Sequence, residues 1–173
     1  MTLREAAVDS PESHRLLADY FDWREASFPS TSGSYTVTFP DPDAFRPPHG
    51  VFRLAVSPDD DLDNEDDGEA IGCGGIRRIA DDQDGRVRYE VKHVWLAPQG
   101  RGRGLATALM TELEERARRF GADAVVLDTH DSLEGAAKLY ARLGYSRVDA
   151  YNNNPNATVW YAKDLSDARS SAV

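Results

Sequence analysis

The residues from 99 to 110, QGRGRGLATALM, restrict the fold more than any other stretch of this sequence. An apolar run at 86–97 leads into three alternating glycines, and Leu105, Leu109 and Leu113 then begin an apolar stripe at helical spacing. A helix N-terminus presents unpaired backbone N–H groups and a partial positive charge, and glycines let a ligand approach them closely. The stretch therefore predicts a strand-to-helix turn that binds an anion, best a phosphate or pyrophosphate.

Two common phosphate-binding motifs do not fit this turn. A P-loop ends in Gly-Lys-Ser or Gly-Lys-Thr, and no such ending follows Gly104. A dinucleotide-binding turn has the spacing G-x-G-x-x-G, whereas Gly100, Gly102 and Gly104 are spaced G-x-G-x-G. The interpretation that is left is a loop for coenzyme A, with Arg101 and Arg103 adding positive charge at its rim.

The remaining patterns predict an α+β fold, or mixed α/β sheet, in the order strand, helix, three strands, helix, strand, helix, two strands. Expected strands lie at 3–8, 51–56, 70–79, 86–97, 124–129, 145–150 and 157–165, and expected helices follow Ser10 and cover about 104–120 and 132–143. The continuous apolar run at 124–129 indicates a buried strand parallel to its neighbour. A further short strand is expected at 34–39, inside a proline-rich connection over 29–50.

The distribution of charge argues against nucleic acid as the main partner. The net charge is −10, and residues 59–69 hold eight of the 30 acidic side chains. The other 22 acids face 20 bases, which leaves −2 for the rest of the chain. We expect 59–69 to form a mobile loop, with attraction of a basic partner as the alternative.

Further features predict a cytoplasmic protein of one domain. No apolar run approaches the roughly 18 residues of a membrane span, and the first residues lack the apolar core of a signal peptide. Cys73 is the only cysteine, so it cannot form an internal disulfide, and its glycine neighbours suggest a small core residue. The 173 residues fit a single acyl-CoA-binding domain over 1–165 with a flexible tail over 166–173.

The glycine-rich turn resembles the coenzyme A loop of the GNAT superfamily of acetyltransferases. In that family the loop has the form R/Q-x-x-G-x-G/A, which Arg101, Gly104 and Ala106 match. Gln99 and Gly102, with Gly104, fit the same form in an earlier register. We prefer the later register because it keeps the usual spacing from strand to helix.

A second motif strengthens the resemblance. The family pattern A-x-x-x-Y-x-x-x-G-F/Y is matched by Ala136, Tyr140, Gly144 and Tyr145. The order of elements also matches, so that the resemblance covers about residues 3–165. It implies a small, single-domain member of bacterial type with a central mixed sheet of six to seven strands flanked by helices.

The resemblance implies an N-acetyltransferase that moves the acetyl group of acetyl-CoA to an amine of a small molecule or peptide, without a metal. It implies that Tyr140 is the general acid and that Glu90, acting through a water, is the base. It implies cofactor binding by Val94, Trp95, Leu96, Arg101, Gly102, Arg103, Gly104, Leu105 and Ala106. A backbone N–H of residues 94–96 would polarise the thioester carbonyl, in a slot opened where that strand splays from 124–128.

Several alternatives stay open. Glu90 is equally well interpreted as a strand carboxylate paired with Lys92 or an arginine. His93 and His130 are alternative bases, although regular pleating would place His93 on the opposite face from Glu90 unless a bulge intervenes. Lys138 and Arg142 are candidates for the coenzyme A phosphates. The acceptor pocket is expected at the first helix, its following loop and the last turn, with the candidates Tyr20, Phe21, Trp23, Phe28, Phe39 and 151–154. A non-catalytic acyl-CoA-binding or regulatory module is the alternative function, and a homodimer is one option for the assembly.

Overall fold

A computed structural model describes residues 2–57 and 68–165 of the chain. The predicted acidic loop at 59–69 lies largely outside these ranges and the predicted tail at 166–173 lies entirely outside them, so both remain predictions. Among the helices of the described ranges, none combines the length and the apolar character needed to cross a bilayer.

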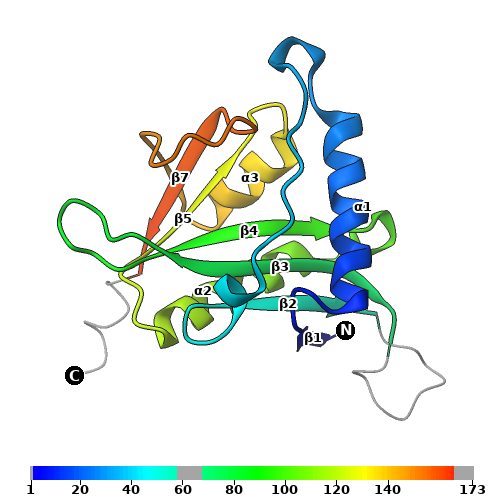
Figure 1. Cartoon of the computed structure of the whole chain (residues 1–173), viewed down its shortest axis with the longest axis horizontal. Coiled ribbons are helices and arrows are strands. Elements are labelled where there is room, and N and C mark those ends of the chain that lie inside the picture. The colour runs from blue at the N-terminus through cyan, green and yellow to red at the C-terminus, as the bar shows by residue number, and fades with distance from the viewer. Residues whose placement is uncertain (1, 58–67, 166–173) are drawn as a thin grey trace.

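A seven-stranded mixed sheet forms the centre of the molecule, in the order β1-β2-β3-β4-β5-β7-β6 (Figure 1). Its strands are β1 Thr2–Glu5, β2 Gly50–Val56, β3 Ala70–Ile79, β4 Arg88–Leu96, β5 Ala124–Thr129, β6 Ser146–Val148 and β7 Val159–Asp164. The helices are α1 Pro11–Ser27, α2 Leu105–Arg119 and α3 Glu134–Arg142, with short 3-10 turns at Ser30–Ser32, Pro42–Phe45 and Pro98–Gly100. The predicted fold class and order of elements are confirmed.

The helices begin and end where local sequence signals place them. The Ser10 side chain accepts a hydrogen bond from the Ser13 N–H at 3.2 Å and so caps α1. Gly121 and Gly144 follow α2 and α3 with φ angles of 86° and 85°, the left-handed geometry that glycine tolerates best.

Each face of the sheet carries its own core. Helix α1 packs Leu16, Leu17 and Phe21 on one face, together with Phe52 of β2. Helices α2 and α3 cover the other face, where Leu113 belongs to the second cluster (Figure 1). Cys73 is fully buried in the first cluster, as expected for a small core residue.

Two strand predictions need correction. Residues 34–39 do not form a strand, because the Asn156 side chain takes the hydrogen bonds of Thr36: Asn156 Oδ1 accepts from the Thr36 N–H, and Asn156 Nδ2 donates to the Thr36 carbonyl, both at 2.8 Å. Strand β1 stops at Glu5 rather than at residue 8, since the turn that leads into α1 begins at Ala7, whose carbonyl accepts from the Ser10 N–H.

The central strands β4 and β5 separate after their first three residues. They pair in parallel from Arg88 with Ala124 to Glu90 with Val126, and no pairing follows within the described residues. Beyond this point β4 also carries a bulge, because His93 and Val94 together face one residue of β3. His93 has a φ of 57°. The strands thus open a gap, as the resemblance implied.

Candidate active site

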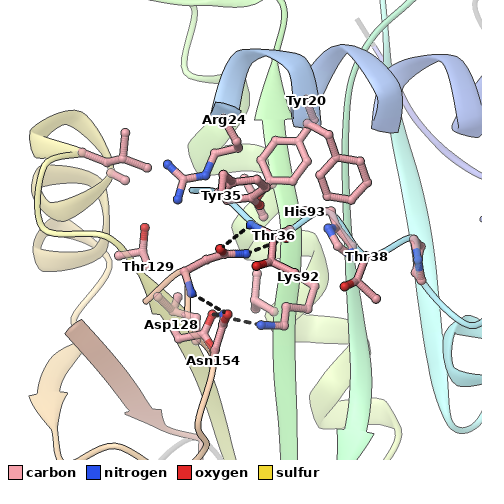
Figure 2. A pocket seen from close by; sticks show the side chains of 18 of the residues that line it. Tyr20, Arg24, Tyr35, Thr36, Thr38, Lys92, His93, Asp128, Thr129 and Asn154 are labelled. Carbon is pink, nitrogen blue, oxygen red and sulfur yellow. Dashed lines mark hydrogen bonds and ion pairs between the residues drawn. The ribbon is translucent and has the colours of Figure 1, made fainter. Parts of the chain in front are cut away.

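Two cavities lie along this gap, and Tyr140 lines both of them. The larger cavity, of about 680 Å³, lies between α1, the segment 35–41 and the ends of β4 and β5 (Figure 2). The smaller one, here the loop cavity, has about 570 Å³ and runs from the end of β4 past the glycine-rich turn to α3. Trp23, Val94, Gly135 and Ala136 also line both cavities, so the two spaces meet around Tyr140.

The glycine-rich turn offers backbone donors to the loop cavity. Gly102 and Gly104 have φ angles of 75° and 77°, and a Cβ at either position would meet nothing within 4 Å. Helix α2 has no side-chain cap, and its first internal hydrogen bond runs from Ala108 to the Gly104 carbonyl. The N–H groups of Leu105, Ala106 and Thr107 therefore have no acceptor in the described part of the chain, which fits a pyrophosphate.

Most of the residues predicted to bind the cofactor lie around the loop cavity. Those that line it are Val94, Trp95, Leu96, Arg101, Gly102, Gly104, Leu105 and Ala106. Arg103 is exposed and does not line it. The Arg101 guanidinium donates to the Leu96 carbonyl at 3.0 Å and lies over the Trp23 ring. Thr107, Gly135 and Leu139 also line the cavity, although the sequence did not predict them. Of the two candidates for the coenzyme A phosphates, Arg142 lines the cavity and Lys138 does not.

Tyr140 comes from α3 and is almost fully buried. Its hydroxyl makes no hydrogen bond with the residues at 2–57 or 68–165. Burial raises the pKa of Tyr140 to about 12, against the opposing effect of the positive charge on Arg24. The phenol therefore stays protonated at neutral pH and can donate a proton where the two cavities meet.

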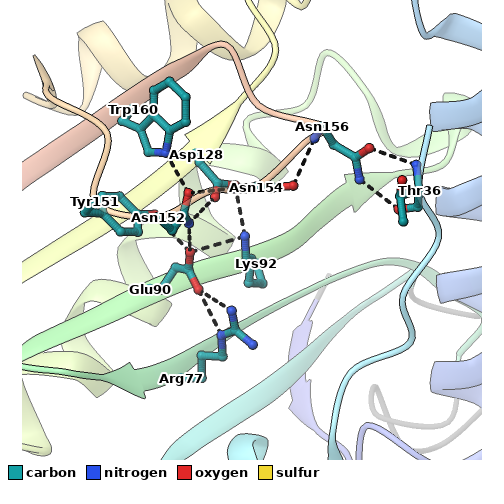
Figure 3. Close-up of polar contacts among 10 residues, drawn as sticks. All are labelled: Thr36, Arg77, Glu90, Lys92, Asp128, Tyr151, Asn152, Asn154, Asn156 and Trp160. Atoms are coloured by element: carbon teal, nitrogen blue, oxygen red, sulfur yellow. Dashed lines mark hydrogen bonds and ion pairs between the residues drawn. The ribbon is translucent and has the colours of Figure 1, made fainter. Parts of the chain in front are cut away.

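Glu90 lies outside both cavities and its carboxylate is fully engaged (Figure 3). Its side chain is 1% exposed, and Arg77 donates to Oε2 from two nitrogens, at 2.9 and 2.7 Å. The Tyr151 hydroxyl at 3.0 Å and the Asn152 amide at 3.3 Å donate to Oε1, and Lys92 Nζ is 3.2 Å from the same oxygen. This geometry agrees with the ion-pair interpretation of Glu90.

The network continues to Asp128, a cavity residue that sequence analysis missed. Lys92 Nζ lies 2.9 Å from Asp128 Oδ1, and the Asn152 and Asn154 amides donate to the two Asp128 oxygens at 2.7 and 3.1 Å. Burial by itself raises the pKa of Asp128, but Lys92 and these amides lower it overall. The available signal was a carboxylate at the end of an otherwise apolar strand.

The two alternative bases differ in placement. The bulge at His93 breaks the regular pleat, as the sequence analysis allowed, and His93 lines the larger cavity together with Lys92, whereas Glu90 does not. Burial, with a smaller effect of Lys92, lowers the pKa of His93 to about 3, which keeps the imidazole neutral. His130 is buried outside both cavities, and its two ring nitrogens contact the hydroxyls of Ser132 at 2.8 Å and Ser32 at 3.1 Å.

The predicted acceptor region mostly lines the larger cavity. Tyr20, Phe21, Trp23, Phe39, Asn152 and Asn154 belong to its wall. Phe28 does not, because its ring packs against His130 at 5.1 Å between centroids. No group of three or more His, Cys, Asp or Glu side chains is placed to hold a metal ion in the part of the chain that the structure describes.

Comparison with known proteins decides the family. The sequence model of the acetyltransferase (GNAT) family matches residues 17–145, which contain the glycine-rich turn, Tyr140 and most of the sheet. The chain belongs to the GNAT family of acetyltransferases. Its fold and its two family motifs are those expected of a GNAT protein.

Relatives of this GNAT protein agree with the assignment. The chain is 29% identical over 119 residues to an uncharacterised N-acetyltransferase of Schizosaccharomyces pombe. The aligned region covers 69% of this chain and 66% of that protein. The chain thus spans about two thirds of that relative's length.

Solved GNAT structures share the fold over nearly the whole chain. A proposed acyl-CoA N-acyltransferase from Klebsiella pneumoniae superposes with a TM-score of 0.69 and 27% identity, over 95% of this chain and 97% of that one. A GNAT acetyltransferase from Elizabethkingia anophelis with acetyl-CoA bound has a TM-score of 0.57 and 17% identity, over 95% and 97%. At 17% identity, the similarity to the Elizabethkingia anophelis protein concerns the fold alone.

Proposed function

We propose that this protein moves the acetyl group of acetyl-CoA to an amine by direct attack of the amine on the thioester. The observation that carries the proposal is the position of Tyr140. The Tyr140 side chain is buried, its phenol stays protonated and makes no hydrogen bond with the described residues, and it lies where the loop cavity meets the larger cavity. One cavity would hold the acyl donor and the other the acceptor, a small molecule or peptide amine.

The chain's own groups fit the acyl donor, which supplies an acetyl group activated as a thioester. The free N–H groups of Leu105, Ala106 and Thr107 would bind the pyrophosphate. The edge of β4 beyond Glu90 has no strand partner on the β5 side, so it can accept the extended pantetheine arm. Within that edge, a backbone N–H among 94–96 would polarise the carbonyl oxygen.

Proton balance gives each group a role. The amine nitrogen forms a bond to the acetyl carbon while the carbon–sulfur bond breaks, and Tyr140 donates its proton to the leaving sulfur. The attacking nitrogen must also lose a proton. We assign this proton to water in the larger cavity, since both oxygens of Glu90 are occupied by Arg77, Tyr151 and other donors. Glu90 as a base through water is the alternative.

Thiol release tests the proposal. The protein is mixed with acetyl-CoA and a panel of amines, and free coenzyme A is measured with a thiol reagent. We expect acceptor-dependent release, and we expect Tyr140→Phe to lower kcat by about 100-fold or more while the affinity for acetyl-CoA is unchanged. Tyr145→Phe is the matched control, because Tyr145 is also buried on the same side of the sheet but lines neither cavity. Binding of acetyl-CoA without release on any amine would indicate the non-catalytic module.

A further inference from the structure

Arg24, in the last turn of α1, is a buried cation for which the described residues offer no carboxylate. The residue is 4% exposed, and its Nη1 atom is buried without a hydrogen bond. No ion pair joins it to any residue in the described ranges. Its guanidinium lies over the Tyr35 ring, 5.0 Å from the centroid, and points into the larger cavity (Figure 2).

An unpaired buried charge is costly, so its position needs an explanation. A guanidinium stays charged at neutral pH, and burying it without a carboxylate is energetically costly because the charge loses its hydration. Along α1 the position of Arg24 continues the apolar series of Leu17 and Phe21, where an aliphatic side chain would pack at no such cost. The cation therefore points to a ligand.

The other charged groups of the larger cavity are already balanced. Lys92 is paired with Asp128 at 2.9 Å, and Arg77 is paired with Glu90 at 2.7 Å. His93 is neutral, because burial lowers its pKa to about 3. Asp41 is exposed and accepts from the Asp43 N–H at 3.1 Å. Among the described residues that line the cavity, Arg24 is the cation that lacks a carboxylate.

We propose that the acceptor amine carries a carboxylate that pairs with Arg24, so that the acceptor is a free amino acid or a close relative. A single unpaired guanidinium matches a monoanion in charge, and its planar donors match the two oxygens of a carboxylate. A peptide N-terminus lacks a carboxylate next to its amine. The inference rests on the proposed function, since it names the acceptor of that same site.

The test compares acceptors that differ only in the carboxylate. The kcat/KM of the protein is measured for a panel of L-amino acids, their carboxamides and dipeptides. We expect the acids to be preferred over the matched amides by about 10- to 100-fold, the size of one charge-assisted contact. Arg24→Met should remove this preference and leave the amides and the KM for acetyl-CoA unchanged. Arg24→Lys should keep part of it. Arg15→Met, at a half-exposed arginine of the same helix, is the control.

A different role for Arg24 gives different results. If its charge served Tyr140 or acetyl-CoA, Arg24→Met would lower kcat for acids and amides alike or raise the KM for acetyl-CoA, and the inference would be overturned. Failure to fold is checked by thermal unfolding without ligand. There Arg24→Met should melt no lower than the parent protein, because the substitution removes an uncompensated charge.

Binding without turnover separates this inference from the proposed function. Calorimetry with the same amino acids and amides, in the absence of acetyl-CoA, should give binding of the acids that Arg24→Met abolishes. Transfer to amines with no preference for a carboxylate would refute the inference and leave the proposed function standing. Binding of acids through Arg24 without thiol release in the complete mixture would refute the proposed function and keep the ligand class.

Discussion

Lys92 and Asp128 form an ion pair of 2.9 Å across the gap between β4 and β5, just beyond the last backbone pairing of the two strands at Glu90 and Val126. Side chains thus connect the two strands where backbone hydrogen bonds no longer do. The pair lies in the wall of the larger cavity, so it contributes both to the stability of the sheet and to the shape of the site.

Asp128→Asn is expected to destabilise the protein by about 2 kcal/mol at pH 7, because a buried charge-assisted contact to Lys92 is lost. The pKa of Asp128 is lowered in the folded state, so its ionised form stabilises the protein above the unfolded pKa of about 3.9. This contribution is lost as the pH falls through the lower folded pKa. Urea unfolding at pH 7 and pH 3 should therefore show a difference between the two proteins that shrinks in acid. An equal difference at both pH values would contradict the role of the charge.

The kcat/KM for the amine should rise about tenfold per pH unit between pH 6 and 8, because a growing fraction of the acceptor has lost its proton. The two titratable groups that face the reaction do not interfere, because the pKa of His93 is about 3 and that of Tyr140 is about 12. Initial rates at saturating acetyl-CoA give the profile. A plateau within this range that disappears in His93→Gln would show that the imidazole accepts the proton instead.

Glu90→Gln separates the two roles considered for this residue. If Glu90 positions Lys92 and Tyr151, we expect a loss of about 3 kcal/mol in unfolding free energy and an unchanged slope of the pH–rate profile. If Glu90 is the base, kcat/KM should fall about 100-fold and the slope should change. Glu115→Gln, in an ion pair with Arg119 on the surface of α2, is the matched control and should cost less than about 1 kcal/mol.

Gly104→Ala should weaken coenzyme A binding by about tenfold or more, because a left-handed φ of 77° becomes strained at the start of α2. Gly85→Ala is a close control. Gly85 has a φ of 76° and equally open surroundings, but it lies in the turn before β4 and lines neither cavity. Calorimetry with coenzyme A should distinguish the two variants, while thermal unfolding should show similar small losses. Equal affinities would mean that the turn does not hold the pyrophosphate.

Local patterns in the sequence were sufficient to predict where most of the helices and strands lie. Strand β3 was predicted with the bounds that the structure has, and α2 within one residue at each end, because alternation, helical spacing and glycine stops are short-range signals. The prediction at 34–39 was wrong for a long-range reason. A strand needs a neighbouring strand as its hydrogen-bond partner. Here the side chain of Asn156, 120 residues away from Thr36 in the chain, makes those backbone hydrogen bonds instead.

The features of the candidate site also divide into those predicted from local sequence and those that depend on long-range contacts. Local sequence signals predicted the glycine-rich turn before α2 and the place of Tyr140 on α3, since both depend on residues within one or two turns of chain. Which charges are paired depends on the tertiary structure. Glu90 meets Arg77 and Tyr151 through strand register and a distant turn, whereas Arg24 meets no carboxylate in the described residues. Such partnerships depend on contacts between segments far apart in the chain, and no periodic pattern in the sequence encodes them.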